Sequence, residues 1–191
     1  MKTAALIAFC IFSPVYALAC DAFVELQNGQ VQEKLAQLKD DTVDDFTKVL
    51  VYEDLACAER ATVRSMAAQT ALAAGPEALK AAVLTETLFD RDILILTPYN
   101  TPDLSEEARA AAQELPAITF RFVSKHRGQS CIGLQDATCH TTYLLDIRST
   151  GVSLTYSGAT AELSLNDASE LEGFYVPKNS TLRIPVRAKL F

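Results

Sequence analysis

The alternation of apolar and polar residues after position 117 is the feature that most constrains how this chain can fold. There, an apolar side chain recurs at every second position, which is the period of a half-buried β-strand. Short connections containing glycine or serine separate the alternating runs, as in β-hairpins. We therefore expect about six strands in an antiparallel meander, closed as a small barrel or packed as a sandwich. The expected strands lie near residues 118–123, 143–148, 152–157, 161–165, 171–176 and 182–190.

The last expected strand has the clearest pattern and one restriction on its position. Pro185 has no backbone N–H to donate to a neighbouring strand. We therefore expect this strand to lie at an edge of the sheet, or to turn Pro185 toward solvent. Its apolar face consists of Leu182, Ile184, Val186, Ala188 and Leu190, and its other face includes Arg183, Arg187 and Lys189.

Residues 21–115 repeat instead with the period of an α-helix. Asp21 is the expected cap of a first helix, which Asn28-Gly29 interrupts before the pattern resumes at Val31. Asp40-Asp41-Thr42 is the expected start of a second helix. The expected buried stripe of that second helix consists of Val43, Phe46, Val49 and Leu50.

Three further helices complete this part of the chain. A long helix is expected from Asp54 to about Ala73, followed after Gly75-Pro76 by a return helix over residues 77–89. A last helix begins at Ser105 and ends before Pro116. The expected fold is therefore α+β, with an N-terminal antiparallel helical module over residues 20–116. A C-terminal antiparallel β-domain follows over residues 117–191.

The first nineteen residues are typical of a secretory signal peptide. Lys2 precedes an apolar stretch from Ala4 to Val15, which is too short to span a bilayer. Ala17 and Ala19 place small side chains where a signal peptidase accepts them. We expect cleavage before Cys20, which predicts a periplasmic or secreted protein.

Four cysteines remain after the expected cleavage, and an oxidising compartment favours their pairing. Three pairings are possible, and we prefer Cys20–Cys57 with Cys131–Cys139. The second pair closes a short loop between strand-like runs, and the first ties the N-terminus to a helix.

A lipid anchor is the alternative for the first of these cysteines. Ala17-Leu18-Ala19-Cys20 resembles the lipobox of bacterial lipoproteins, which implies a lipid on Cys20 and attachment to a membrane. That motif usually has leucine where this chain has Ala17, and lipidation leaves Cys57 without a partner. We therefore favour the soluble, disulfide-bonded form.

The charge is divided unevenly along the chain. Residues 20–120 carry eighteen Asp and Glu against eight Lys and Arg, a net charge of −10. Residues 121–191 carry six against eight, a net charge of +2. So acidic a first part argues against nucleic acid as the partner, because phosphate binding requires the opposite sign.

The sequence offers little support for catalysis or for a cofactor. His126 and His140 are the two histidines, and neither has the spacing of a metal site. The chain contains no G-x-S-x-G, no glycine-rich phosphate loop and no H-E-x-x-H. We expect no enzymatic activity, no metal and no cofactor.

One basic cluster is the candidate binding patch. If the first and last strands of the β-domain are neighbours, their basic side chains form one exposed surface. The alternative is that these charges protect strand edges against aggregation. The loop over residues 128–138 is a second candidate, because a constrained loop loses less entropy on binding. The proposed patch consists of Arg121, Lys125, His126, Arg127, Arg183, Arg187 and Lys189.

These observations favour a non-enzymatic protein of the cell envelope that binds an unknown envelope protein or a small ligand. A small periplasmic hydrolase with dispersed catalytic residues is one alternative. A lipid-anchored accessory subunit of an envelope complex is the other.

Overall fold

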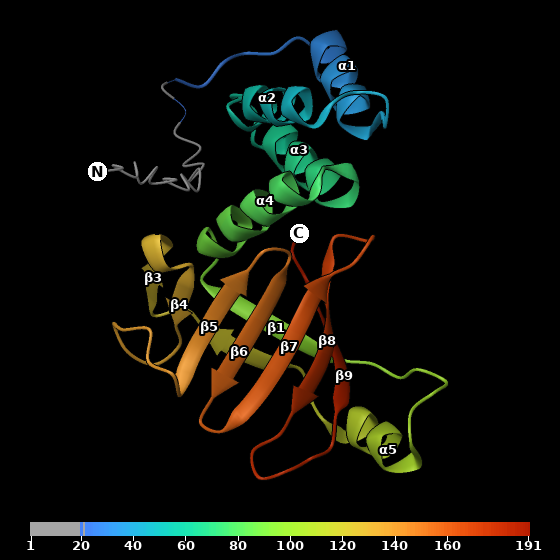
Figure 1. The fold of residues 1–191 in the computed structure, drawn as a ribbon, viewed down its shortest axis with the longest axis vertical. Coiled ribbons are helices and arrows are strands. Elements are labelled where there is room, and N and C mark those ends of the chain that lie inside the picture. Colours follow the sequence, from blue (N-terminus) through green and yellow to red (C-terminus); the bar gives the residue numbers. More distant parts are fainter. Residues whose placement is uncertain (1–19, 21) are drawn as a thin grey trace, which may run out of the picture.

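The structure, a computed structural model, describes Cys20 and residues 22–191. The expected signal peptide and the expected cap at Asp21 lie outside the described residues. The α+β prediction is confirmed, with the first four helices stacked above one end of a strongly curled antiparallel sheet and the fifth beside its last strand (Figure 1). The described helices are α1 (Asn28–Lys39), α2 (Asp45–Ala56), α3 (Ala61–Ala74), α4 (Glu77–Phe89) and α5 (Glu106–Glu114).

In the part of the chain that the structure describes, nine strands form one sheet in which every neighbouring pair is antiparallel. The order across the sheet is β2-β1-β9-β8-β7-β6-β5-β4-β3. The strands are β1 (Ile93–Pro98), β2 (Ile118–Arg121), β3 (Ser124–His126), β4 (Cys131–Gly133), β5 (Tyr143–Arg148), β6 (Gly151–Tyr156), β7 (Ala159–Leu165), β8 (Glu170–Val176) and β9 (Ile184–Lys189).

The two outer strands of this order, β2 and β3, belong to one continuous segment. Only Phe122 and Val123 separate them. The Phe122 N–H donates to the Asp92 carbonyl, and the Val123 N–H donates to the Gly133 carbonyl, both at 2.9 Å. The segment therefore borders β1 on one side and β4 on the other, which requires the sheet to curl back on itself.

The inside of the curl is the core of the β-region. Buried residues alternate with exposed ones along β7, and with half-buried ones along most of β6, as the period of two predicts. The rings of Phe120 on β2 and Tyr156 on β6 lie 5.5 Å apart, although several strands separate them along the sheet. The fully buried large side chains of the sheet are Leu94, Leu96, Ile132, Leu145, Leu154 and Leu171.

Three strands lie outside the predicted set, and one of them comes from the predicted helical module but pairs with strands of the predicted β-domain. Residues 93–98 belong to the expected helical module, yet they form β1, which pairs with both β2 and β9. Leu94 and Leu96 are fully buried, whereas Ile93 and Ile95 face outward. Because both faces of β1 carry aliphatic residues, its sequence shows no apolar–polar alternation. The sheet therefore contains strands from both sides of the predicted boundary at residue 116. The short strands β3 and β4 were not predicted either.

The expected position of the last strand is wrong. β9 lies inside the sheet, between β1 and β8, and Pro185 is buried. The last β1–β9 register pair is Pro98 with Val186, and the Tyr99 N–H then donates to the Pro185 carbonyl at 3.1 Å. The missing N–H of Pro185 therefore falls where β1 ends, so an interior strand accommodates it.

The N-terminal residues also differ from the prediction. Residues 22–27 contain no helix, and Val24 forms a parallel bridge with Ala58. Asn28-Gly29, expected to interrupt a helix, begins α1 instead. The single long helix expected from Asp54 is divided between the end of α2 and the whole of α3, because the chain turns at residues 57–60. The bridge from Val24 and the disulfide from Cys20 both attach at this turn.

The expected buried stripe of α2 is wrong as well. The helix starts later than expected, where the Asp44 carboxylate accepts a hydrogen bond from the Thr47 N–H at 3.0 Å. α2 buries Val51, Tyr52 and Leu55, whereas Phe46 is 70% exposed. Several faces of this helix carry apolar residues, so its periodicity does not determine which face is buried.

Candidate functional site

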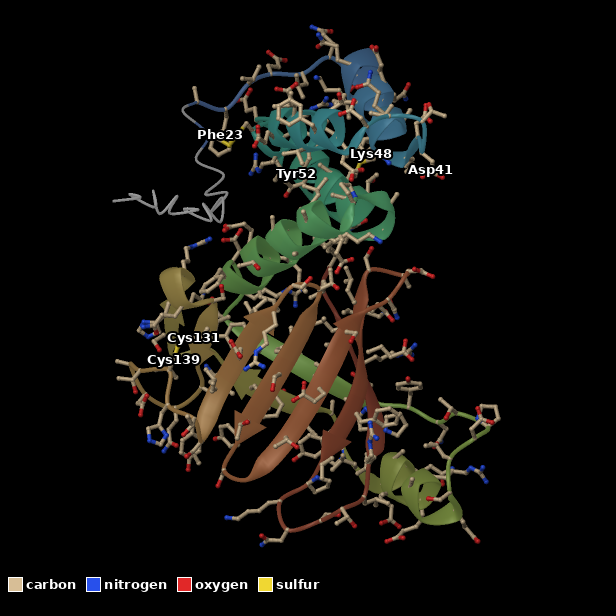
Figure 2. All side chains as sticks on the ribbon, viewed as in Figure 1. Phe23, Asp41, Lys48, Tyr52, Cys131 and Cys139 are labelled. Carbon is tan, nitrogen blue, oxygen red and sulfur yellow. A yellow bond between two sulfur atoms is a disulfide. The ribbon has the colours of Figure 1, made fainter. Side chains whose placement is uncertain are left out.

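Both predicted disulfides are present. Cys20–Cys57 joins the N-terminal segment to the turn between α2 and α3, with the two Cα atoms 5.5 Å apart. Cys131–Cys139 closes the loop after β4, with a Cα separation of 6.2 Å. Figure 2 shows this second bond beside β3 and β4, and Phe23 and Tyr52 in the helical region.

The proposed basic patch does not form one surface, because β1 lies between β2 and β9. Arg121 lies opposite Ile93 in the β1–β2 ladder. Lys125 forms an ion pair with Asp92 at 3.3 Å. Arg127 pairs with acidic side chains at the end of α4 and stacks on Phe89, 5.0 Å from the ring centre.

The basic residues of the last strand make a separate group. Arg183 stacks on Phe174, with 4.3 Å between guanidinium carbon and ring centre. Arg187 lies 5.7 Å from the ring centre of Tyr99. Most members of the proposed patch therefore contact this chain's own aromatic or acidic side chains.

The two histidines stabilise the loop that the second disulfide closes. His126 Nε2 lies 3.0 Å from the Ala137 carbonyl oxygen and 3.2 Å from Ser124 Oγ. His140 Nδ1 accepts a hydrogen bond from the Thr142 N–H at 3.3 Å. Within residues 22–191 and Cys20, no group of three or more His, Cys, Asp and Glu is arranged to hold a metal ion.

A hollow of about 440 Å³ lies where the helices meet the end of the sheet, and we call it the junction pocket. Helices α2, α3 and α4 form its walls together with the segment before α1 and the residues after β9. The residues that line it are Cys20, Phe23, Tyr52, Ala56, Arg64, Ser65, Ala68, Glu86, Thr87, Asp90, Arg91, Leu190 and Phe191.

Tyr52 lines the junction pocket, and its hydroxyl oxygen reaches the surface of the pocket. Its side chain is 6% exposed, and its hydroxyl has no hydrogen-bond partner among the described residues. Burial raises the pKa of Tyr52 to about 12, and the nearby carboxylates of Glu86 and Asp90 add to the shift. The hydroxyl therefore remains protonated and able to donate at neutral pH.

Arg91 supplies the second polar group, just beyond the end of α4. Its guanidinium is partly buried, which lowers its pKa, and it has no ion pair with any carboxylate that the structure describes. Arg64 differs, because it donates to the Ala58 and Glu59 carbonyls at 2.7 Å and stacks on Phe23.

The two acidic residues of the pocket are also engaged. Glu86 forms an ion pair with Arg127, and Asp90 lies 3.5 Å from the same guanidinium. The apolar part of the wall includes Phe23, which is 61% exposed, and Leu190 and Phe191. Among the described residues, the pocket therefore combines the Arg91 guanidinium and the Tyr52 hydroxyl, which have no partner, with aromatic and aliphatic surface.

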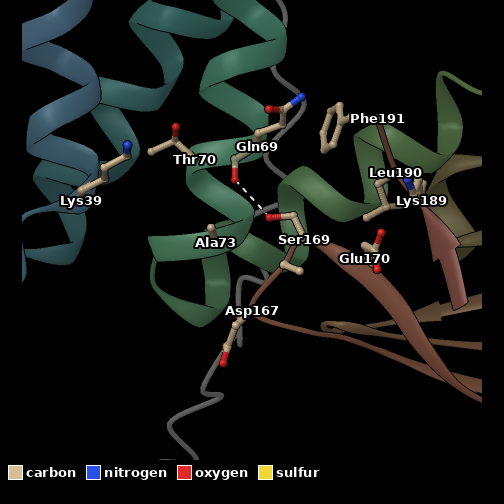
Figure 3. Close-up of a pocket in the computed structure, with 11 residues that line it drawn as sticks. Lys39, Gln69, Thr70, Ala73, Asp167, Ser169, Glu170, Lys189, Leu190 and Phe191 are labelled. Atoms are coloured by element: carbon tan, nitrogen blue, oxygen red, sulfur yellow. Dashed lines mark hydrogen bonds between the residues drawn. The ribbon is translucent and has the colours of Figure 1, made fainter. Parts of the chain in front are cut away.

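A second hollow, of about 450 Å³, adjoins the first beyond Leu190 and Phe191 (Figure 3). Its wall is mixed in charge, with Lys39 and Lys189 beside Asp167 and Glu170. Its buried hydroxyl is already engaged, because Ser169 Oγ donates to the Gln69 carbonyl at 3.2 Å. This arrangement makes the junction pocket the stronger candidate.

Sequence reasoning missed the junction pocket because its residues come from five separate segments. Tyr52 lies within an apolar helical pattern and is indistinguishable from a core residue. Arg91 follows a helix, where a cation favourably meets the helix dipole. The one available signal was the series of alanines at positions 56, 67, 68 and 71, which leaves space between helices.

Among the described residues, no helix has both the length and the apolar character needed to cross a bilayer. Comparisons with known protein families, with curated proteins and with solved structures found no match to this chain.

Proposed function

We propose that this chain is an exported, disulfide-stabilised, non-enzymatic protein of the cell envelope that binds a small ligand in the junction pocket. The observation that carries the proposal is a hollow in which Tyr52 and Arg91, two polar groups without a partner among the described residues, lie beside aromatic and aliphatic surface. Small-molecule sites combine apolar walls with a few polar groups that fix the orientation of the ligand.

The disulfides support the assignment to an oxidising compartment. All four cysteines that follow the expected signal peptide are paired, and neither bridge leaves an odd thiol. Such bonds persist in the periplasm and outside the cell, and they are rare in the cytosol. Pairing of Cys20 also favours the soluble form over the lipid-anchored one.

Binding accounts for the junction pocket better than catalysis does. Its two carboxylates are held by Arg127, and His126 and His140 contribute to the loop around residues 131–142 instead. A general acid or base needs a titratable group within reach of the substrate. The groups of this pocket are suited to hold a ligand in place.

Export is tested by expressing the full chain in a Gram-negative bacterium. The expected result is a periplasmic protein that begins at Cys20, contains two disulfides and has no free thiol by intact-mass analysis. A cytosolic product with reactive thiols, or an acyl group on Cys20, would contradict the proposal.

Ligand binding is tested by extracting small molecules from the protein purified from its native envelope. Ser65→Trp and Thr87→Trp each fill the junction pocket, and Arg109→Trp on α5 is the matched control. We expect mass spectrometry to detect a compound in the wild-type and control extracts that both pocket variants lack. Identical extracts from all four folded proteins would rule out the pocket as the binding site.

A further inference from the structure

We infer that the ligand of the junction pocket is a small organic anion, with a carboxylate held by Arg91 and Tyr52 and an apolar body against the aromatic wall. The inference rests on the proposed function and adds the chemical class of the ligand. It depends on which charged and polar groups of the pocket are already engaged.

In the part of the chain that the structure describes, Arg91 is the cation of the pocket whose guanidinium has no partner. Among the described residues, Arg127 serves both carboxylates of the wall, Glu86 and Asp90. The guanidinium of Arg64 donates to two backbone carbonyls. Neither Arg64 nor Arg91 has an ion pair among the described residues, but the two carbonyls and the Phe23 ring hold Arg64 in place, whereas Arg91 has no such partner and is partly removed from water. A guanidinium in such a place favours a carboxylate, whose two oxygens match its planar fork.

The hydroxyl of Tyr52 provides a second donor of the kind that a carboxylate requires. The hydroxyl oxygen reaches the pocket surface and has no hydrogen-bond partner among the described residues, so the hydroxyl is free to donate to a bound acceptor. Burial and then the neighbouring carboxylates raise the pKa of Tyr52, so its hydroxyl keeps the proton that it can donate to a carboxylate. Arg127 limits the repulsion between these carboxylates and an incoming anion.

The rest of the wall suits an apolar body rather than a second charged group. Phe23 and Phe191 present exposed rings, and Ala56, Ala68 and Leu190 add aliphatic surface. A hollow of about 440 Å³ is within the range of pockets that hold small organic molecules. A medium-length fatty acid or an aryl carboxylate has both features.

Three probes of equal chain length test the inference: octanoate, octanol and octylamine. Titration calorimetry of the mature, disulfide-bonded protein at neutral pH measures each affinity. We expect octanoate to bind at least about tenfold more tightly than octanol, because only the carboxylate uses both donors. We expect octylamine to bind more weakly than octanol, because its ammonium group faces Arg91.

Variants then test the two residues directly. Arg91→Met should weaken octanoate about tenfold and leave octanol unchanged, and Arg91→Lys should restore part of the loss. Tyr52→Phe should weaken octanoate about fivefold, since it removes one donor. Arg109→Met, which removes a cation from α5, should change neither affinity. Melting curves identify any variant that fails to fold.

The inference is wrong if octylamine binds best, if folded Arg91→Met retains full affinity for octanoate, or if no probe binds. These results leave the proposed function standing as long as the filled-pocket variants lose their extracted compound. If the extracts are identical, the proposed function itself fails. The two conclusions can therefore be rejected separately.

Discussion

The helical region of α1–α4 and the curled sheet are specified by different kinds of contact. Each strand interior to the sheet pairs with two neighbours, and one buried face then determines its register. The helices pack through small and aliphatic side chains on several faces, and Phe46 remains 70% exposed. A pattern of period two therefore fixes the sheet locally, whereas the helices depend on tertiary contacts and on the Cys20–Cys57 bond.

The largest expected effect comes from adding one methyl group to the sheet. A Cβ at Gly173 would lie 1.9 Å from the Glu162 carbonyl oxygen on β7, and backbone atoms surround it. Gly173→Ala must therefore separate β7 from β8, and we expect it to lower the free energy of unfolding by about 4 kcal/mol or more. Equilibrium unfolding in urea measures the change.

The helical counterpart is Gly29→Ala in the first turn of α1. No atom lies within 4 Å of the added Cβ, so we expect a gain of up to about 1 kcal/mol from helix propensity. Equal and small effects at the two glycines would show that the close contact between β7 and β8 does not limit the stability of the sheet.

Removing the two disulfides compares the same regions through their unfolded states. The bridges span sequence separations of 37 and 8 residues. By the chain-entropy relation, the loss is about 4 kcal/mol for Cys20→Ala with Cys57→Ala, and about 2.5 kcal/mol for Cys131→Ala with Cys139→Ala. Urea unfolding of both double variants tests this order.

A larger loss of unfolding free energy in the Cys131→Ala, Cys139→Ala variant would contradict this order. Hydrogen exchange shows which part of the fold is destabilised. Without Cys20–Cys57 we expect faster exchange in α2 and α3, while β6 and β7 keep their protection.

Most of the sheet could be predicted from the sequence, because its alternation is a local property. The six predicted strands are present, and the failures have identifiable causes. β1 carries isoleucines on its outer face, so Ile93 and Ile95 conceal the period. The interior position of β9 depends on where β1 ends relative to Pro185, which a single strand's pattern does not contain.

The candidate site could be predicted much less well than the fold. The disulfide pairs could be predicted because one closes a short loop between strand-like runs and the other ties the N-terminus to a helix, which are local features of the sequence. The basic patch failed because its premise, that β2 and β9 are neighbours, concerns long-range strand order. The junction pocket joins Tyr52 and Arg91 because α2 and α4 both pack on α3, which no local pattern reports.

The smallest expected effect, a dependence of stability on pH, compares one tyrosine from each region. The pKa of Tyr52 is raised to about 12 by burial and then by Glu86 and Asp90. The pKa of Tyr99 is also raised to about 12, by burial and by its hydrogen bond to Glu172. An unfolded tyrosine loses its proton near pH 10, as the reference values indicate. Both groups therefore reduce stability as the pH rises from about 10 toward 12.

Urea unfolding across the pH range separates the two tyrosines. Tyr52→Phe should remove a loss of the order of 2 kcal/mol at the alkaline end, since each pKa unit corresponds to about 1.4 kcal/mol. Tyr99 is more exposed, so its alkaline contribution is smaller. The Tyr99 hydroxyl also lowers the pKa of Glu172, which stabilises the fold above the usual pKa of glutamate and loses this effect as the pH falls. Tyr99→Phe should therefore also reduce the dependence of the unfolding free energy on pH in the acid range, whereas Tyr52→Phe should leave that dependence unchanged. An acid-side change in Tyr52→Phe would mean that the helical region and the sheet do not titrate independently.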